Sequence, residues 1–420
     1  MLIIFTVGCK NNQPIVESSF VDSVLNSNTA SSINIKEQEV TFWKNRVDTL
    51  HPGITNELRY ASALATRFAA TGDIRDIITA DSILYRINER YNGKEASPFK
   101  MLAAHAITRH HFREADSLIA IARQIGLKKY DEATASFDVD FELGRHGHAG
   151  SILDNIKNEN DYGYNFRQSK LAHYKGDIDS AINYMMKAVT LAQNNIVLKQ
   201  TALSNVGDLY LHSGDFSNSY NAYKTSLRLN TSDNHSLLGI GWIVLVHDKN
   251  DSLAKAIFTS AQSRTKLPDP LYKLSQACQA SADSIGEITY ANEFAEQATD
   301  TLYGGMYNKY LIELYTGILH DAARAESLAK GELNNRSTPQ THAWYTWALY
   351  CNNKKDEAYK EYTAYVSGKP LEALELYYMG KMMKSLGKGY NAHEYFKAAS
   401  QNKYDLSPRM IKDITDNLEE

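Results

Sequence analysis

The sequence predicts an all-α protein in which one helical hairpin is repeated along most of the chain. Small and aromatic residues recur at fixed offsets, in about ten copies between residues 54 and 402. Only eight of the 420 residues are proline, which suits long helices better than a loop-rich sandwich. Because one such hairpin cannot bury its own apolar face, successive hairpins must stack on one another. We therefore expect a right-handed superhelical solenoid, extended as a rod and coupled only between adjacent repeats.

The hairpin is clearest in the stretch NVGDLYLHSGDFSNSYNAYKTSLRLN, residues 205–230. Its repeating positions are Gly207, Tyr210, Gly214, Ser219, Tyr223 and Ser226. The first two share one face of a first helix, and the last three lie at i, i+4 and i+7 on a second helix. Gly214 and Asp215 supply the turn, since glycine ends helices and aspartate caps the start of the next one. Small residues allow close helix approach, and the aromatic rings fill the space between neighbouring pairs.

Similar series recur along the chain. Four clear copies are Gly380, Met383, Gly387, Ala392, Phe396, Ala399; Ala103, Ala106, His110, Ala115, Ile119, Ala122; Ser169, Ala172, Gly176, Ala181, Met185, Ala188; and Phe137, Asp140, Gly144, Ala149, Leu153, Ile156. Looser copies carry Gly239, Trp242, Ala254, Phe258, Ala261; Phe294, Ala298; Tyr315, Ala322, Ala329; Ala348, Ala358, Tyr362; and Ala65, Gly72, Ala80, Leu84. This recurrence resembles the tetratricopeptide repeat over about four-fifths of the chain.

The N-terminus, MLIIFTVGC, is a short apolar run that ends at Cys9. It resembles a bacterial lipoprotein signal, residues 1–9, in which the cysteine is lipidated and the preceding peptide is removed. Thr6 stands where leucine is usual and no basic region precedes the run, as expected if the start codon is mis-assigned. The alternative is an incidental cysteine at a frayed apolar terminus. The run is too short to span a bilayer.

The remaining segments flank the repeats. Residues 10–35 are rich in Asn and Ser and predict a flexible polar tether. Residues 36–53, with Phe42, Trp43 and Val47 at helical spacing, predict an N-terminal capping helix before the repeats at 54–402. Residues 403–420 predict a C-terminal capping helix opened by Pro408, with inward residues Met410, Ile411 and Ile414.

A triplet of Asp, then Ser or Thr, then a small or aliphatic residue is over-represented. It begins at Asp22, Asp48, Asp81, Asp116, Asp179, Asp251, Asp283 and Asp300. The triplet resembles the O-glycosylation acceptor of exported Bacteroidota proteins. The alternative is that Asp-Ser pairs simply suit helix starts and polar faces.

Composition and motifs give no support for nucleic-acid binding, a metal or a cofactor. The net charge is −4 and the pI about 6.4, so no basic surface is expected. His146 and His148 fall in a predicted turn, where convergence with carboxylates into a metal site is not expected. The isolated Gly239-x-Gly241 follows no buried strand and is better explained by close helix packing. Cys278 and Cys351 lie about two repeats apart, too far for a disulfide.

The resemblance implies that the first helices line a concave groove that binds peptides or proteins. By register, the predicted groove residues are Phe166, Lys170, His173, Tyr174, Asp208, His212, Tyr377, Lys381 and Lys384. Their mixture of aromatic and charged groups suits protein recognition. The alternative is a merely solvated inner face.

The most economical hypothesis is a non-enzymatic scaffold, lipid-anchored in the bacterial cell envelope and binding a protein or peptide partner. As an outer-membrane lipoprotein it would face the periplasm or the cell surface. The first alternative is a glycan-binding outer-membrane lipoprotein that assists a nutrient transporter; the second is an enzyme with an unrecognised site. The long insertions that carry the sugar site in such glycan-binding relatives are missing from the nearly uninterrupted repeats.

Overall fold

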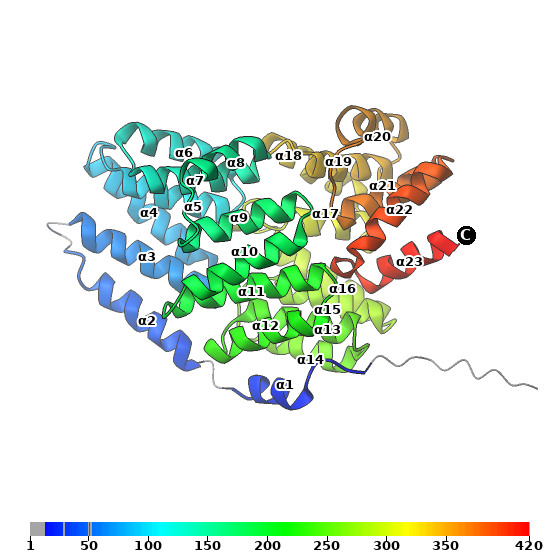
Figure 1. Ribbon diagram of the computed structural model, residues 1–420, viewed down its shortest axis with the longest axis horizontal. Helices are drawn as coiled ribbons and strands as arrows, with labels where there is room; N and C mark the ends of the chain where they lie inside the picture. Colours follow the sequence, from blue (N-terminus) through cyan, green and yellow to red (C-terminus); the bar gives the residue numbers. More distant parts are fainter. Residues whose placement is uncertain (1–12, 28–29, 49, 51–52, 420) are drawn as a thin grey trace, which may run out of the picture.

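The computed structural model describes residues 13–27, 30–48, 50 and 53–419. All regular structure in these residues is helical, and the helices from α3 to α22 pair into ten successive hairpins, which confirms the predicted all-α repeat (Figure 1). We number the hairpins from the first, α3–α4, to the tenth, α21–α22. The helices are α3 Ile54–Thr71, α4 Ile74–Arg90, α5 Ala96–Thr108, α6 Phe112–Ile125, α7 Lys129–Glu142, α8 His146–Asn155, α9 Tyr162–Tyr174, α10 Ile178–Leu191, α11 Ile196–His212, α12 Phe216–Leu229, α13 Asn234–Val246, α14 Asp251–Gln262, α15 Asp269–Ala280, α16 Ser284–Ala298, α17 Asn308–Thr316, α18 Ala322–Asn335, α19 Pro339–Cys351, α20 Lys355–Glu361, α21 Ala373–Ser385 and α22 Gly389–Gln401.

The surroundings of Tyr223 explain why small and aromatic residues alternate. Its fully buried ring lies between Gly207 of α11 and Gly239 of α13. A Cβ atom on Gly207 would lie 2.3 Å from the ring, and one on Gly239 would lie 2.5 Å from it. Any larger residue would push the helices apart, so these positions require glycine. Gly380 and Phe396 repeat the arrangement in the tenth hairpin.

Each of the ten hairpin turns contains one residue with positive φ. These residues are Gly72, His110, Gly144, Gly176, Gly214, Lys249, Ala282, His320, Asn353 and Gly387. The left-handed conformation ends the first helix and lets its last carbonyl groups be satisfied. Where the residue is not glycine, the turn has the same form at a cost of about 1 kcal/mol. The looser repeats therefore keep the hairpin geometry although they lack the glycine.

The superhelix closes on itself, so the predicted extended rod is wrong. Turns of the first three hairpins contact the loops that precede the seventh, eighth and ninth hairpins. The paired segments are 71–73 with 265–267, 109–112 with 302–305 and 335, and 142–144 with 336–338. We call this line of contacts the seam. In Figure 1 its third contact lies along the top of the view, where the turn before α8 meets the loop after α18.

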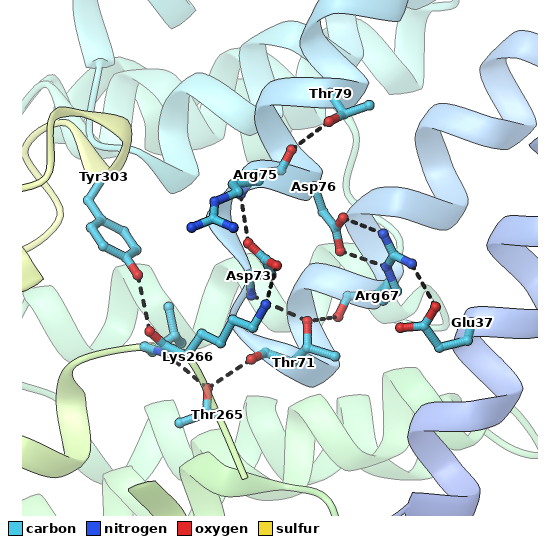
Figure 2. A network of polar contacts seen from close by, with 11 residues as sticks. Glu37, Arg67, Thr71, Asp73, Arg75, Asp76, Thr79, Thr265, Lys266 and Tyr303 are labelled. Carbon is cyan, nitrogen blue, oxygen red and sulfur yellow. Dashed lines mark hydrogen bonds and ion pairs between the residues drawn. The ribbon is translucent and has the colours of Figure 1, made fainter. Parts of the chain in front are cut away.

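The first contact of the seam is shown in Figure 2. The Lys266 backbone N–H donates to the carbonyl of Thr71 at 2.8 Å, and its Nζ lies 2.6 Å from the Asp73 carboxylate. Thr265 donates its hydroxyl to the same Thr71 carbonyl. Gly72 is pressed against this loop, since an added Cβ would lie 2.4 Å from Oγ1 of Thr265. The turn of the first hairpin thus leaves no room for a side chain.

The second and third contacts use different residues. Gly305 donates its backbone N–H to the carbonyl of Arg109 at 3.0 Å. The side-chain amide of Asn335 accepts from the Phe112 backbone N–H and donates to the carbonyl of His110. At the third contact, Arg336 forms an ion pair with Glu142 at 3.5 Å. Each pairing joins segments more than 190 residues apart, so coupling extends beyond adjacent repeats.

Equal repeat lengths keep the two sides of the seam in register. The turns are centred on Gly72, His110 and Gly144, and their partners on Lys266, Gly304 and Thr338. From the residue numbers, both series step by 38 and then by 34 residues. The contact therefore recurs at each hairpin, without any one residue type being required.

The fourth turn breaks this series. A Cβ atom on Gly176 would meet nothing within 4 Å, and residues 175–177 and 367–370 are exposed. Contact resumes at the fifth turn, where a Cβ on Gly214 would lie 2.8 Å from the Tyr404 ring. Trp242 also donates its indole N–H to the carbonyl of Tyr404 at 2.8 Å. The seam is thus interrupted at one hairpin.

The predicted tether, residues 10–35, is not a free linker over its described part. Helix α1, Ser18–Leu25, lies beside α14 (Figure 1), and Val16, Val21 and Val24 are buried there. The backbone N–H groups of Ile15 and Val16 donate to the Asp248 carboxylate at 2.9 and 3.1 Å. A short apolar stripe within this polar segment is enough to dock it.

Two further helices flank the array. Helix α2, Ala30–Lys44, packs on the first hairpin through Val40 and Trp43, whereas Phe42 is 46% exposed. Helix α23, Pro408–Glu419, buries Ile414 and packs on α22 and α15. Short η1 Thr301–Tyr303, η2 Tyr362–Val366 and η3 Lys403–Asp405 lie in connections. None of the helices in the described residues is long and apolar enough to cross a membrane.

Candidate functional site

The inner face of the superhelix encloses three adjoining cavities of about 480, 310 and 300 Å³. Tyr310 lines all three of them. Other residues line two cavities each: Asp269, Tyr272, Lys273, His173, Lys309, Glu372 and Asp405. Because the walls are shared, we treat the cavities as one central chamber and call the largest the large cavity.

The first helices of the hairpins supply most of the chamber wall. Lining residues come mainly from α9, α11, α13, α15, α17, α19 and the start of α21. The second helices contribute only the rings of His146, Tyr223 and Phe294. Since each first helix faces the superhelix axis, polar residues at the same register in successive hairpins meet inside the chamber.

Four of the predicted groove residues line the chamber. Tyr174 stacks on His146, with ring centres 3.5 Å apart. Asp208 accepts hydrogen bonds from the Tyr223 hydroxyl at 2.6 Å and from Nε2 of His235. His173 and His212 lie edge to face, and Nδ1 of His212 is 2.5 Å from the Asp405 carboxylate.

The other five predicted groove residues do not line the chamber. Phe166 stacks on Tyr162, and Lys170 pairs with Glu142 at 3.2 Å. Tyr377 and Lys381 contact Asp413 of α23 at 2.7 and 2.8 Å, and Lys384 donates to Asn417. The part of the groove expected to bind a partner through Tyr377, Lys381 and Lys384 is therefore occupied by the C-terminal helix of the chain itself.

The sequence analysis did not predict several tyrosine and charged residues that line the chamber. Tyr272, Lys273, Lys309, Tyr310, Glu313 and Glu375 come from the seventh, eighth and tenth hairpins. The seventh and eighth are looser copies, whose first helices carry few of the small residues that mark the register. Aligning the seventh and eighth hairpins on their turns, at Ala282 and His320, would have placed the residues that these two hairpins supply on the inner face.

Several chamber groups titrate away from their ordinary values. Burial lowers the pKa of Lys273 to about 8, and its ammonium group lies 3.7 Å from the centre of the Trp242 ring. The charge of Asp208 raises the pKa of His235 to about 9. Burial raises the pKa of Glu313, whose carboxylate accepts a hydrogen bond from Tyr272 at 2.7 Å. The chamber therefore presents both charge signs at neutral pH.

Many of the carboxylates are held by an aromatic donor. Tyr223 bonds Asp208, Tyr272 bonds Glu313, Tyr307 bonds Asp269 and Trp344 bonds Glu375. This fixes the carboxylates in place and leaves part of their acceptor capacity facing the cavity. Within the described residues, no three His, Cys, Asp or Glu side chains converge as metal ligands would. The arrangement suits binding of a polar chain by stacking and hydrogen bonds.

Comparison with known proteins identifies one hairpin directly. A family model described as tetratricopeptide repeat matches residues 162–195, which comprise α9, α10 and the turn after them. Among solved structures, one titled "Functional Characterization of Pseudomonas Aeruginosa pilF" is 13% identical, over 53% of this chain and 99% of that one, with a TM-score of 0.37. A tetratricopeptide repeat protein from Parabacteroides merdae is 14% identical, over 62% and 99%, with a TM-score of 0.36. No curated protein matches the chain.

Proposed function

We propose that this tetratricopeptide repeat protein is a non-enzymatic scaffold that holds an extended segment of a partner protein in its central chamber. The observation that carries the proposal is the chamber wall, in which aromatic faces alternate with fixed carboxylates and with the ammonium groups of Lys273 and Lys309. A peptide presents carbonyl and N–H groups together with side chains of every kind. A wall that offers stacking, donors and acceptors side by side matches that mixture.

Photocross-linking inside cells tests this proposal. A photoreactive phenylalanine analogue at Tyr174 places the reactive group in the large cavity. The control position is Tyr85 of α4, which is 45% exposed on the surface and outside the chamber. We expect a defined protein adduct from position 174 and none from position 85. Adducts from position 85 alone would contradict the proposal, and binding to a glycan array without any protein adduct would favour the glycan-binding alternative.

A companion variant should weaken capture without loosening the fold. His212 is unsuited, because its imidazole pairs with Asp405 beside the seam. Tyr310 is the better choice, since its ring lines all three cavities. We expect Tyr310→Ala to reduce the adduct at position 174, with helicity measured by circular dichroism as the control. An undiminished adduct would show that the partner does not reach this wall.

We also propose that the scaffold is anchored in the cell envelope through a lipid on Cys9. Cys9 lies outside the described residues, but Ile15, six residues later, is fixed to Asp248. Six residues span at most about 20 Å. The lipid would therefore hold the face formed by α1, α12 and α14 close to the bilayer, in one orientation.

Fractionation tests the anchor. When both proteins are expressed behind the same complete export signal, wild type is expected in the membrane pellet and Cys9→Ala in the soluble fraction. Metabolic labelling with a radioactive fatty acid should mark the wild type alone. Equal membrane retention of the two proteins would overturn the anchor and leave the chamber proposal untouched, because the cross-linking readout is independent of it.

A further inference from the structure

The large cavity carries more negative charge than its own lining neutralises. Its carboxylates are Glu142, Asp269, Glu372 and Glu375. Glu142 is paired with Lys170 and Arg336, and Asp269 accepts a hydrogen bond from Tyr307. Glu372 and Glu375 remain, and apart from Arg336 the described lining offers one lysine or arginine, Lys309. Because the Tyr307 hydroxyl is neutral, Asp269 keeps its charge, and the four carboxylates of the lining outnumber Arg336 and Lys309 by two.

The histidines of this cavity do not supply the missing charge. Burial lowers the pKa of His110 to about 4. Burial also lowers the pKa of His146 and of His173, so all three imidazoles are neutral at pH 7. Burial alone would lower the pKa of His212 in the adjoining cavity, but its hydrogen bond to Asp405 and the negative charges of Asp405 and Glu372 raise it, and the positive charge of this imidazole is paired with Asp405. The excess negative charge of the large cavity therefore persists at neutral pH.

Glu375 has an acceptor that nothing in the described chain satisfies. Its side chain is 1% exposed, and Oε1 accepts a hydrogen bond from the Trp344 indole at 2.6 Å. Oε2 is buried and has no hydrogen-bond partner. A buried carboxylate oxygen without a donor is costly, more so than a neutral acceptor. A donor supplied by a ligand would remove that cost.

Two neighbouring side chains also have acceptor oxygens that no hydrogen-bond donor satisfies. Glu372, one turn before Glu375, makes no hydrogen bond or ion pair through its carboxylate in the described residues, and burial together with the charge of Glu375 raises its pKa. In the adjoining cavity, Oε1 of Gln276 is buried without a partner. All three groups accept hydrogen bonds, so their complement is a donor.

We propose that Glu372 and Glu375 together bind one basic side chain, arginine or lysine, of the peptide held in the chamber. This inference rests on the proposed function and adds to it the class of residue recognised. A basic side chain brings one positive charge and several N–H donors, which are what the cavity lacks. The rings of Tyr310 and Trp344, in the same cavity, suit its aliphatic stem and flat guanidinium group.

Two residues of this cavity adjoin, in sequence, the exposed segments at which the seam is interrupted. Tyr174 ends the helix before the fourth turn, and Glu372 follows the exposed segment 367–370. Both residues line the large cavity.

Peptide pools with one fixed central residue test the proposal directly. Four N-acetylated heptapeptide pools carry arginine, lysine, citrulline or norleucine at the centre, with uncharged residues randomised around it. Binding to the detergent-solubilised full chain is measured by fluorescence anisotropy. We expect the arginine and lysine pools to bind at least about tenfold more tightly than the citrulline and norleucine pools, since charge-assisted hydrogen bonds are the strong ones. Added salt should shrink this preference.

Three variants separate the site from general electrostatics. Glu372→Gln should reduce the preference for basic pools to below about threefold, and Glu372→Gln with Glu375→Gln should abolish it. The control Glu293→Gln makes the same charge change on exposed α16, outside the chamber, and should leave the preference intact. Glutamine at 375 still offers Trp344 an acceptor, so the fold is expected to survive; circular dichroism checks this.

The outcomes distinguish this inference from the function on which it rests. Equal binding of charged and uncharged pools to wild type would overturn the basic-residue site while peptide binding stands. A preference that survives the double variant would also overturn it, since the recognition would then lie elsewhere. Failure of every pool to bind wild type would contradict peptide binding itself, and this site with it.

Discussion

The first and fourth hairpins share one turn geometry but differ in what surrounds it. Gly72 and Gly176 have φ of 71° and 78°, and the aspartate that follows each glycine caps the next helix, Asp73 by accepting from the Arg75 N–H and Asp177 by accepting from the Ser180 N–H. A Cβ on Gly72 would collide with Thr265 and with the backbone of the loop, whereas one on Gly176 would meet nothing within 4 Å. The backbone therefore favours glycine at both turns, but only at the first turn is there no space for a side chain.

This difference shows that one set of residues specifies the hairpin and another set closes the superhelix. The repeat signature specifies the hairpin, and the fourth hairpin, which the family model matches, follows it without any seam contact. Closure of the superhelix depends on residues outside that signature, such as Lys266 and Asn335. Substitutions at equivalent positions of the two hairpins should therefore have unequal effects, and the seam is the cause.

The largest expected difference in the free energy of unfolding is between the variants Gly72→Ala and Gly176→Ala. Alanine at positive φ costs about 1 kcal/mol in either turn. At Gly72 the methyl group also displaces the loop, which adds about 1–3 kcal/mol of overpacking. Chemical denaturation should show a loss of about 2–4 kcal/mol for Gly72→Ala and about 1 kcal/mol for Gly176→Ala.

Hydrogen exchange shows whether the lost stability comes from the seam. The Lys266 amide donates to the Thr71 carbonyl across the seam, so its exchange should accelerate in Gly72→Ala and stay slow in Gly176→Ala. Equal destabilisation of the two variants, with Lys266 still protected in both, would show that the seam contributes nothing to stability.

Asn335→Ala is expected to have the next largest effect. Its amide holds the Phe112 N–H and the His110 carbonyl, and alanine leaves both without that partner. Two partly buried backbone groups without partners cost about 2 kcal/mol. The matched control is Asn334→Ala, one residue earlier in α18 and exposed, which should change the free energy of unfolding by less than about 0.5 kcal/mol. Similar losses in both variants would assign the effect to α18 itself.

The hairpins were predictable because their determinants are local. Helix period, turn residue and the pairing of glycine with an aromatic ring all fall within one or two repeats, as for Gly207 and Tyr223. The seam was not predictable, since it depends on the pitch of the whole superhelix, which small rotations between hairpins accumulate. The one related feature of the sequence is that the turns and their partner loops share the same spacings of 38 and 34 residues. These spacings can be compared only once the structure shows which segments pair.

The chamber was predictable in part for the same reason. His173, Tyr174, Asp208 and His212 were found because their hairpins follow the signature closely. Tyr377 and Lys381 have the right register, but the chain's own α23 covers them, which no repeat pattern encodes. Likewise, the docking of α1 depends on a few valines in a polar segment whose composition predicted a free tether.

The smallest expected difference in the free energy of unfolding is between the variants Asp73→Ser and Asp177→Ser. Serine still caps the following helix, so both variants keep the cap, and only Asp73→Ser loses the ion pair with Lys266. Lys266 is 64% exposed, so the pair contributes about 0.5 kcal/mol, screened by salt. Burial alone would raise the pKa of Asp73, but the hydrogen bond from Lys266 outweighs it and the pKa lies below its ordinary value. The contribution of this ion pair is therefore present above the unfolded-state pKa of Asp73, near 3.9, and is lost as the pH falls through the lower folded-state value.

Denaturation at pH 7 in low salt should show Asp73→Ser to be less stable than Asp177→Ser, and the difference in stability should disappear in about 1 M salt. A gap that persists in high salt would mean that Asp73 supports the seam through its cap and not through its charge.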